Sequence, residues 1–212
     1  MDKPETRRAY ARIAPWYDAL ELLPELLGIR GMRRRILKRA RGRVLEVAAG
    51  TGRNLAHHRA DVQLIAADMS LEMLLRAAKK AHKRQLDAQF AVMDGEMLAV
   101  RDRVFDTVLS TLTLCTFPDP LKALREMARV CVPDGRILLV EHGRSSRTRV
   151  ASWQDRHAER HAQMLGCHWN REPLDLVREA GLDVVESDRN FLGIFHVIEA
   201  RRRRGQPVAF SE

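Results

Sequence analysis

Three acidic residues stand in or directly after short apolar runs in the first half of the chain. Glu46 lies in the run Val44–Val47, Asp68 follows a second run, and Asp94 follows a third. If these runs are parallel strands, their carboxyl ends meet in one crevice, where sheets of this kind bind ligands. Carboxylates accept hydrogen bonds from ribose hydroxyls and ammonium groups. The three side chains therefore predict a negatively charged pocket for a cationic ligand that carries a ribose.

A turn of small residues follows the first run, with Ala48, Gly50 and Gly52 at alternate positions. Glycine lets the backbone approach a ligand closely, and a helix expected from about Arg53 would point free N–H groups at it. The spacing differs from the Gly-x-Gly-x-x-Gly of dinucleotide-binding proteins, since Ala48 and Arg53 occupy its first and last positions. A P-loop is excluded because no Gly-Lys-Ser/Thr sequence follows.

The elements that must position these residues alternate along the chain. We expect strands at 44–47, 62–67, 88–93, 104–110 and 136–141, helices from about 53, at 70–84 and at 118–130, and a turn at 133–135. Strict alternation predicts a parallel sheet with helices on both faces. Two more helices follow, at 148–166 and about 171–180, and then strands at 182–188 and 191–200.

The link between the last two strands is short enough only for an antiparallel hairpin. The fold class expected is therefore α/β, with a Rossmann-like, seven-stranded, mostly parallel sheet, a C-terminal antiparallel hairpin strand and helices on both faces. Residues 1–42 would form a helical lid interrupted at Pro15, Pro24 and Gly28. Residues 43–200 would form the main domain, with a substrate-covering segment at 145–168, and residues 201–212 a flexible basic tail.

Composition narrows the class of protein. The 212 residues suggest one domain, and 45% hydrophobic residues allow a real core. The three cysteines are widely spaced without a CxxC pair, which argues against a disulfide framework or structural zinc, so no metal is expected. No apolar run is long enough to span a membrane, and the N-terminus lacks the apolar stretch of a secretory signal. These features predict a cytoplasmic protein.

The chain is strongly basic, with 37 lysines and arginines against 28 acidic residues and a net charge of +9. This balance favours anionic partners, either nucleic acid or an acidic membrane surface. The segment Arg30–Arg43 places eight basic side chains among apolar ones at helical spacing. We favour a solvated basic face for it; the alternative is a peripheral contact with the phosphates of an anionic membrane. Aromatic residues make up only 5%, which weakens recognition by base stacking.

Several motifs, taken together in order and spacing, resemble one enzyme family. They are Glu46–Gly52, Asp68–Leu74, Phe90–Asp94, Phe105–Val108, Pro133–Arg136 and the opening Tyr10–Asp18. Over about residues 6–200 the chain resembles the class I S-adenosylmethionine-dependent methyltransferases, in the branch of the ubiquinone and menaquinone methyltransferases. It departs from the family at Ala48, where glycine is usual, but alanine is small enough for the turn. The resemblance implies a methyltransferase with S-adenosylmethionine as its cofactor.

The resemblance also implies which residues bind this cofactor, and they come from strand ends, turns and the lid. They are Tyr10, Tyr17, Glu46, Ala48, Gly50, Gly52, Asn54, Asp68, Met69, Asp94, Gly95, Glu96, Thr111 and Leu112. Asp68 would bind the ribose hydroxyls, and Met69 would cover one face of the adenine. Leu112 would lie near the sulfonium, while Tyr10 and Tyr17 would close over the methyl group.

His142 is the candidate base or acceptor-orienting residue, because it ends the fifth expected strand and would face the crevice. The alternative is a histidine bonded to the neighbouring backbone. Tyr17 is the second catalytic candidate. Trp153 and Leu114 are expected to line the acceptor pocket beside His142. Cys115 is interpreted as buried packing, since methyl transfer needs no covalent enzyme intermediate.

Residues 110–115, 140–142 and 166–172 resemble the thiol S-methyltransferase-like group and are also compatible with bacterial phospholipid N-methyltransferases. This implies transfer to sulfur or nitrogen of a small-molecule or lipid acceptor. The alternatives are a quinone or phenolic C- or O-methyltransferase and a nucleic-acid-binding methyltransferase. Residues 110–113 read Ser-Thr-Leu-Thr, where enzymes that methylate nucleic-acid bases usually carry Asn/Asp-Pro-Pro-aromatic, which disfavours nucleic acid. A non-enzymatic binding module is opposed by the intact cofactor signature.

Overall fold

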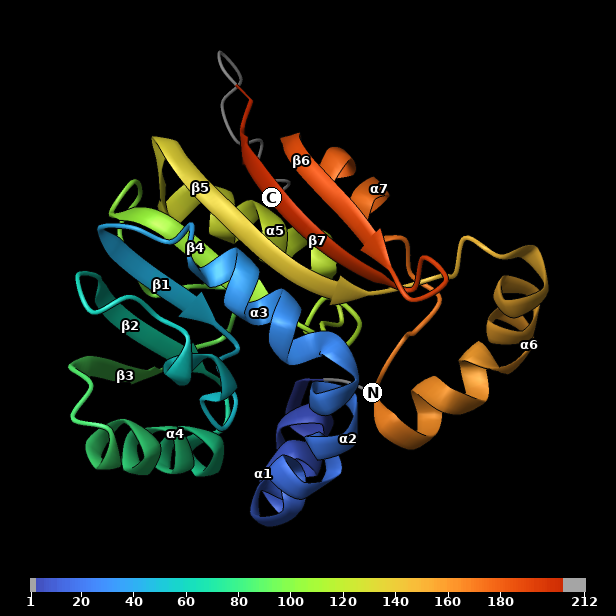
Figure 1. The fold of residues 1–212 in the computed structure, drawn as a ribbon, viewed down its shortest axis with the longest axis horizontal. Coiled ribbons are helices and arrows are strands. Elements are labelled where there is room, and N and C mark those ends of the chain that lie inside the picture. The colour runs from blue at the N-terminus through green and yellow to red at the C-terminus, as the bar shows by residue number, and fades with distance from the viewer. Residues whose placement is uncertain (1–2, 204–212) are drawn as a thin grey trace.

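A computed structural model of the chain describes residues 3–203 and is built around one sheet (Figure 1). The seven strands lie in the order β3-β2-β1-β4-β5-β7-β6. They are β1 (Arg43–Val47), β2 (Gln63–Asp68), β3 (Ala88–Val92), β4 (Phe105–Thr111), β5 (Cys131–His142), β6 (Leu182–Asn190) and β7 (Phe195–Arg202). Strand β7 runs antiparallel to both β5 and β6, and the other pairs are parallel. The expected fold class is confirmed.

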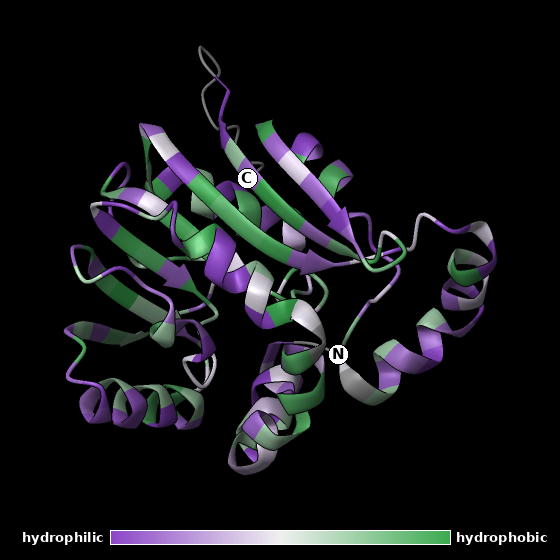
Figure 2. Cartoon of the chain, viewed as in Figure 1, coloured by the Kyte–Doolittle hydropathy of each residue, from purple (hydrophilic) through white to green (hydrophobic). Residues whose placement is uncertain are grey.

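Helices cover both faces of the sheet. They are α1 (Lys3–Leu20), α2 (Leu22–Pro24), η1 (Glu25–Ile29), α3 (Arg30–Leu37), η2 (Arg53–Ala56), α4 (Leu71–Lys83), α5 (Pro120–Val130), α6 (Thr148–Leu165) and α7 (Pro173–Glu179). Successive strand residues point to opposite faces, so Leu45 packs with the apolar side chains of α5 and α7 while Val44 packs with those of α3 and α4. Figure 2 shows the apolar strand residues along the sheet interior.

Helices α1, α2 and α6 lie at the carboxyl end of the parallel strands, whereas α3, the last helix of the N-terminal segment (residues 3–42), packs across one face of the sheet and leads into β1 (Figure 1). Within residues 3–203, no helix combines the length and the apolarity needed to cross a bilayer.

Some expected boundaries are wrong. Helix α1 continues through Pro15, which removes one N–H but leaves the remaining helical bonds and the buried Ala14 in place. The expected interruption at Gly28 is present, since its φ of 134° is one that only glycine adopts easily, and α1 itself ends at Leu20. The helix expected from about Arg53 is only the short 3₁₀ helix η2, which follows the left-handed Gly52.

Two further differences concern the last strands. The turn expected at 133–135 lies inside β5, which accommodates it with a bulge opposite β4. Strand β7 extends to Arg202, so the expected tail begins within a strand, and residues 204–212 lie outside the described part of the chain.

Candidate functional site

A polar cavity opens at the carboxyl ends of β1, β2 and β4, under α1. The expected cofactor residues on its wall are Tyr10, Tyr17, Ala48, Gly50, Asp68, Met69, Asp94, Gly95, Glu96, Thr111 and Leu112. Of the remaining three, Glu46 and Asn54 belong to a buried network behind this wall, and Gly52 lies where a side chain would collide with Leu55. The structure therefore brings the acidic strand ends, the small-residue turn and the N-terminal segment together.

Asp68 fastens the small-residue turn to the start of α4. Its Oδ2 accepts a hydrogen bond from the backbone N–H of Gly50 at 2.8 Å, and its Oδ1 accepts one from Ser70 at 2.9 Å. The Ser70 hydroxyl in turn caps α4 by accepting from the N–H of Met73. Burial raises the pKa of Asp68, and the two backbone hydrogen bonds oppose that rise.

The turn itself is left-handed at three alternating positions. Ala48, Gly50 and Gly52 have φ values of 53°, 57° and 77°. The left-handed conformation at position 48 explains why glycine is usual there, since alanine tolerates it less easily. At Gly50, an added side chain would meet no atom within 4 Å, so the space above the turn is open to a ligand.

A buried polar network lies behind the cavity wall. Glu46 is 2% exposed, and its two oxygens are 2.9 Å from Asn54 Nδ2 and from His58 Nε2. Asn54 also donates to the Thr111 hydroxyl at 3.0 Å. Arg33 completes the network, since its Nη1 donates to Asn54 Oδ1 at 3.1 Å and to the Thr111 hydroxyl. Every member of this network is therefore tied to a neighbour.

Sequence reasoning missed Arg33, which was assigned to the basic segment Arg30–Arg43. The side chain is 4% exposed, lines the polar cavity and pairs with Glu25 at 2.8 Å. Helical periodicity could have indicated that Arg33 is buried, because it shares one helix face with the apolar residues Ile29, Ile36 and Leu37. All three are buried.

Other members of the basic segment are also engaged inside the chain. Arg35 lies 2.6 Å from Asp188, and Arg39 lies 2.7 Å from Glu186 and 3.0 Å from Glu199. The basic segment is therefore not wholly the solvated face that we favoured, since Arg33 is buried and Arg35 and Arg39 have acidic partners. A contact of the segment with a membrane stays a prediction.

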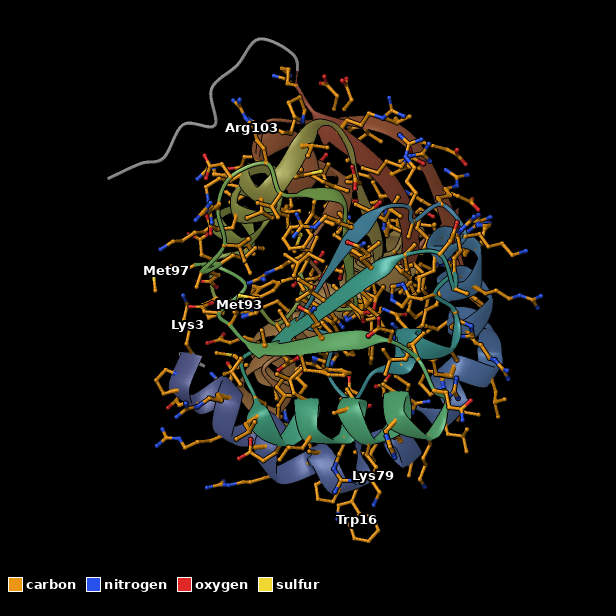
Figure 3. All side chains as sticks on the ribbon, turned by 90° about the vertical axis from the view of Figure 1, so that its left-hand side faces the viewer. Lys3, Trp16, Lys79, Met93, Met97 and Arg103 are labelled. Carbon is orange, nitrogen blue, oxygen red and sulfur yellow. The ribbon has the colours of Figure 1, made fainter. Side chains whose placement is uncertain are left out.

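Helix α1 is held across the polar cavity at both ends. Lys3 Nζ lies 2.7 Å from the carboxylates of Asp94 and Glu96. At the other end, Asp18 accepts from the Thr51 hydroxyl at 2.7 Å and pairs with Lys80 at 2.5 Å. Figure 3 shows Lys3 beside Met93, at the edge of the sheet.

Two tyrosines lie between these anchors. The rings of Tyr10 and Tyr17 are 6.1 Å apart. Burial raises the pKa of both phenols, so both keep their protons at neutral pH and can donate hydrogen bonds.

A second cavity, of about 650 Å³, adjoins the first between α1 and α6 and is lined mainly by apolar side chains. Four residues, Tyr10, Tyr17, Leu112 and Thr116, line both cavities. His142 and Trp153, both expected at an acceptor pocket, line this second cavity. Leu114 does not: it is 1% exposed and packs in the core. The left-handed Leu112, with φ of 59°, reverses the chain after β4 and turns Leu114 inward.

Glu141 holds that turn in place. Its side chain is fully buried, and Oε2 accepts hydrogen bonds from the N–H groups of Thr113 at 2.9 Å and Leu114 at 3.1 Å. Burial raises the pKa of Glu141 to about 7. The sequence around Glu141 did not indicate that it fixes this turn, because the contact joins the end of β5 to the residues after β4.

His142 follows Glu141 and points into the second cavity, where its Nε2 lies 3.3 Å from the Cys167 Sγ. A thiol is therefore a close partner of the ring, which the sequence did not suggest. Hydrogen bonds from Cys115 and His142 lower the pKa of Cys167. Burial alone would lower the pKa of His142, but the contact with Cys167 outweighs it and raises that pKa.

Comparisons with known proteins show which family the chain is similar to. Residues 45–139 match a family model described as a methyltransferase domain. Over 165 residues the chain is 32% identical to the phosphatidylethanolamine N-methyltransferase of Cereibacter sphaeroides, an alignment that covers 76% of this chain and 81% of that protein. The chain belongs to the S-adenosylmethionine-dependent methyltransferases of class I.

Two further comparisons define how far this similarity extends. The mitochondrial methyltransferase OMS1 of Saccharomyces cerevisiae is 29% identical over 94% of this chain, but the chain spans only 46% of OMS1. A solved structure from Thermotoga maritima, titled a possible histamine N-methyltransferase, superimposes with a TM-score of 0.69. It covers 93% of this chain and all of that one at 21% identity, which shows the shared methyltransferase fold.

The methyltransferases of this family take S-adenosylmethionine as methyl donor, and the polar cavity fits it. Carboxylates of Asp68, Asp94 and Glu96 lie on the wall, where ribose hydroxyls and a cationic ligand need acceptors. Met69 and Met93 provide the polarizable apolar surface that a purine ring needs. The open space above Gly50 admits a ligand close to the backbone.

Proposed function

We propose that this chain methylates sulfur or nitrogen of a small-molecule or lipid-like acceptor bound in the second cavity. The main observation behind this proposal is that the two cavities adjoin. They share four lining residues, Tyr10, Tyr17, Leu112 and Thr116. A donor in the polar cavity and an acceptor in the apolar cavity would meet at these residues. Holding two reactants in line supplies much of the acceleration of such a transfer.

The chain's own residues prepare both reactants. S-adenosylmethionine, when bound, supplies an electrophilic methyl group on its sulfonium. Asp68 would accept hydrogen bonds from the ribose hydroxyls, and Met69 would cover the adenine. Tyr10 and Tyr17 would exclude water from the junction, and their phenols can donate hydrogen bonds to the acceptor.

His142 is the residue that would position the acceptor's nucleophile. It lies at the carboxyl end of β5 and lines the acceptor cavity, with its Nε2 directed at Cys167. A neutral imidazole can orient a thiol or amine by hydrogen bonding and can accept its proton. Removing such a group typically slows turnover by roughly 10²-fold or more.

The surface around the acceptor cavity supports a lipid-like acceptor. Ile13, Leu20, Trp153 and Met164 line the cavity and are themselves 38–69% exposed. The N-terminal segment carries further exposed apolar side chains, Trp16, Leu22, Leu23 and Leu26. Figure 2 shows the apolar character of α2, and Figure 3 shows Trp16 projecting away from the body of the protein. Large exposed apolar patches often mark membrane or partner contacts.

An acceptor drawn from a bilayer would enter through this rim. The relative from Cereibacter sphaeroides bears the name of an enzyme that methylates phosphatidylethanolamine, and a lipid amine is one acceptor that the apolar cavity could admit. A quinone or phenolic acceptor is the alternative. The apolar lining gives no support to a nucleic-acid base.

The test is an acceptor screen with methyl-labelled S-adenosylmethionine. The acceptors are phosphatidylethanolamine in phosphatidylcholine vesicles, alkyl thiols, and a demethylated quinol analogue, with phosphatidylcholine vesicles alone as the blank. We expect label in a lipid amine or a thiol, and turnover of His142→Ala reduced by roughly 10²-fold with S-adenosylmethionine affinity retained. Label in the quinol alone would replace the proposed acceptor by the alternative. Full turnover in His142→Ala would remove the histidine from the reaction.

A further inference from the structure

We propose that Cys115, His142 and Cys167 bind one soft divalent metal ion of the zinc type. The two sulfur atoms and one ring nitrogen all lie within 4.8 Å of one another. Cys167 Sγ lies 3.3 Å from His142 Nε2. The sequence predicted no metal, because the cysteines are far apart along the chain and belong to no CxxC motif.

The spacing fits tetrahedral coordination. Zinc–sulfur bonds are about 2.3 Å long and zinc–nitrogen bonds about 2.0 Å. Neighbouring ligand atoms in a tetrahedral site are therefore about 3.5–3.8 Å apart. The observed atoms need to move by only about an ångström at most, which is within the reach of cysteine and histidine rotamers.

The fold holds the three residues together before any ion binds. Cys115 lies in the turn after β4, His142 is the last residue of β5, and Cys167 follows α6. A backbone hydrogen bond from the N–H of His168 to the carbonyl of Cys115, 2.8 Å long, joins the two cysteine segments. The ring of His161, stacked on Trp169, contacts the carbonyl of Cys167 at 2.8 Å. A preformed ligand set loses little conformational entropy when the ion binds.

The charges balance. Binding of the ion removes one proton from each thiol and releases both to solvent, which leaves two thiolates and a neutral imidazole around a doubly charged cation. The resulting centre has no net charge, so its burial costs less than burial of an isolated ion. Thiolate and imidazole together select soft or borderline metals over magnesium or calcium.

The ion would have one free position. All three ligands line the acceptor cavity, and three protein ligands with an open fourth site form the arrangement typical of catalytic zinc rather than structural zinc. With the ion bound, the ligating nitrogen of His142 is not available as a base, so a thiol that enters this position would release its proton to solvent and bind as its thiolate. This last step rests on the proposed acceptor cavity, whereas the metal site itself does not.

The site can be tested without any methyl transfer. The chain, reduced and treated with a chelator, would be titrated with Co²⁺ and then with Zn²⁺. We expect one equivalent of Co²⁺ to bind with a thiolate-to-cobalt charge-transfer absorption, and Zn²⁺ to abolish the absorption by displacement. Zn²⁺ should also protect the thiol of Cys167 from alkylation, a readout that needs no variant.

Variants identify the ligands. Cys115→Ser, Cys167→Ser and His142→Gln should each weaken Zn²⁺ binding by more than the roughly 10–100-fold that loss of a mere supporting residue costs. The matched controls are Cys131→Ser, the third cysteine of the chain, and His157→Gln on α6, and both should bind as the wild type does. A missing charge-transfer band, a band that survives in Cys115→Ser or Cys167→Ser, or unchanged alkylation of the wild type would each overturn the proposal. Methyl transfer that persists in metal-free protein would leave the proposed function standing and remove only the role of the fourth position.

Discussion

Arg33 lines the polar cavity proposed to hold the cofactor, and its Nη1 lies 3.1 Å from the Oδ1 of Asn54. This hydrogen bond joins α3 of the N-terminal segment to the residues directly behind the small-residue turn. Asn54 passes the connection on to Glu46 at 2.9 Å. The position of the N-terminal segment and the shape of the cofactor cavity are therefore coupled through one buried side chain.

Arg33→Met should weaken binding of S-adenosylmethionine by tenfold or more. A hydrogen bond to a charged group contributes about 1.5–3 kcal/mol, and about 1.4 kcal/mol is a factor of ten in affinity. The thermal midpoint should also fall, because Glu25 would be left buried without its partner. The double variant Arg33→Met with Glu25→Leu should recover stability but not affinity. Arg34→Met, at an exposed position of the same helix, is the control in calorimetric titrations, and equal affinity in all four proteins would contradict this role.

Asp68→Ala should weaken S-adenosylmethionine binding by about 10–150-fold, since two ribose hydroxyls lose a charged acceptor worth about 1.5–3 kcal/mol. The carboxylate also receives the N–H groups of Gly50 and Ser70. Asp68→Asn, which retains one acceptor oxygen, should lose less affinity for S-adenosylmethionine than Asp68→Ala does. Asp61→Ala removes an exposed aspartate that lines neither of the two cavities described above and should bind S-adenosylmethionine normally. Unchanged affinity in Asp68→Ala would refute the ribose contact.

The sheet could be predicted from sequence because its signals are local. Apolar runs such as Val44–Val47 fit buried parallel strands and little else, and the short link before β7 allows only an antiparallel partner. The small-residue turn was also visible, because glycine at fixed offsets marks backbone that approaches a ligand. These features depend on a few neighbouring residues, so one sequence suffices.

The parts that escaped prediction depend on contacts between distant segments. Cys115 and Cys167 are unremarkable alone, and they meet only because α6 returns the chain to the end of β4. The network of Arg33 needs α3 to cross the strand ends, which no local pattern encodes. Leu114 was misplaced for the same reason, since Glu141, on β5, fixes the turn that buries it.

Lys3→Met should raise the dissociation rate of S-adenosylmethionine several-fold with little change in stability. Lys3 pairs with Asp94 and Glu96 at 2.7 Å, and its side chain is 33% exposed. Partly exposed ion pairs contribute at most about 1 kcal/mol, so the pair can bias an opening motion of α1 without stabilising the fold. Stopped-flow displacement at low and high salt would measure this. High salt should bring the wild type close to Lys3→Met, and Arg12→Met, on an exposed position of α1, should behave like the wild type.

Trp16→Ser combined with Leu23→Ser should reduce recovery with lipid vesicles in a flotation assay. These side chains are 71% and 65% exposed and belong to the N-terminal segment, other residues of which line the acceptor cavity. Burying a large apolar side chain is worth about 1.5–3 kcal/mol, so vesicle affinity should fall at least tenfold. Leu75→Ser, which removes an equally exposed leucine on α4, is the control.

The same assay tests the basic segment. If Arg30–Arg43 contacts lipid phosphates, anionic vesicles should recover more protein than neutral ones, and added salt should remove the difference. Equal recovery with both kinds of vesicle at low salt would show that the basic segment does not contact lipid phosphates.

The stability of the protein should fall as the pH drops from about 6.5 to about 4, in part because of His196. This side chain on β7 is completely buried, and burial lowers its pKa from 6.5 to about 4. Between these values the unfolded chain binds a proton at His196 that the folded chain excludes. Protonation therefore favours unfolding, and the contribution is complete above pH 6.5 and lost progressively below it. A depression of this size corresponds to at most about 3 kcal/mol.

His196→Gln removes the titrating group while keeping a polar side chain of similar size. Denaturant unfolding at a series of pH values should give the variant a shallower loss of unfolding free energy between pH 6.5 and 4 than the wild type. The comparison uses the slope against pH, so a variant that is less stable at every pH remains informative. The carboxylates titrate in both proteins, and their contribution cancels in the difference. His82→Gln, at an exposed position near the end of α4, should keep the wild-type slope. Parallel curves for His196→Gln and the wild type would mean that His196 is protonated as readily in the folded protein as in the unfolded one.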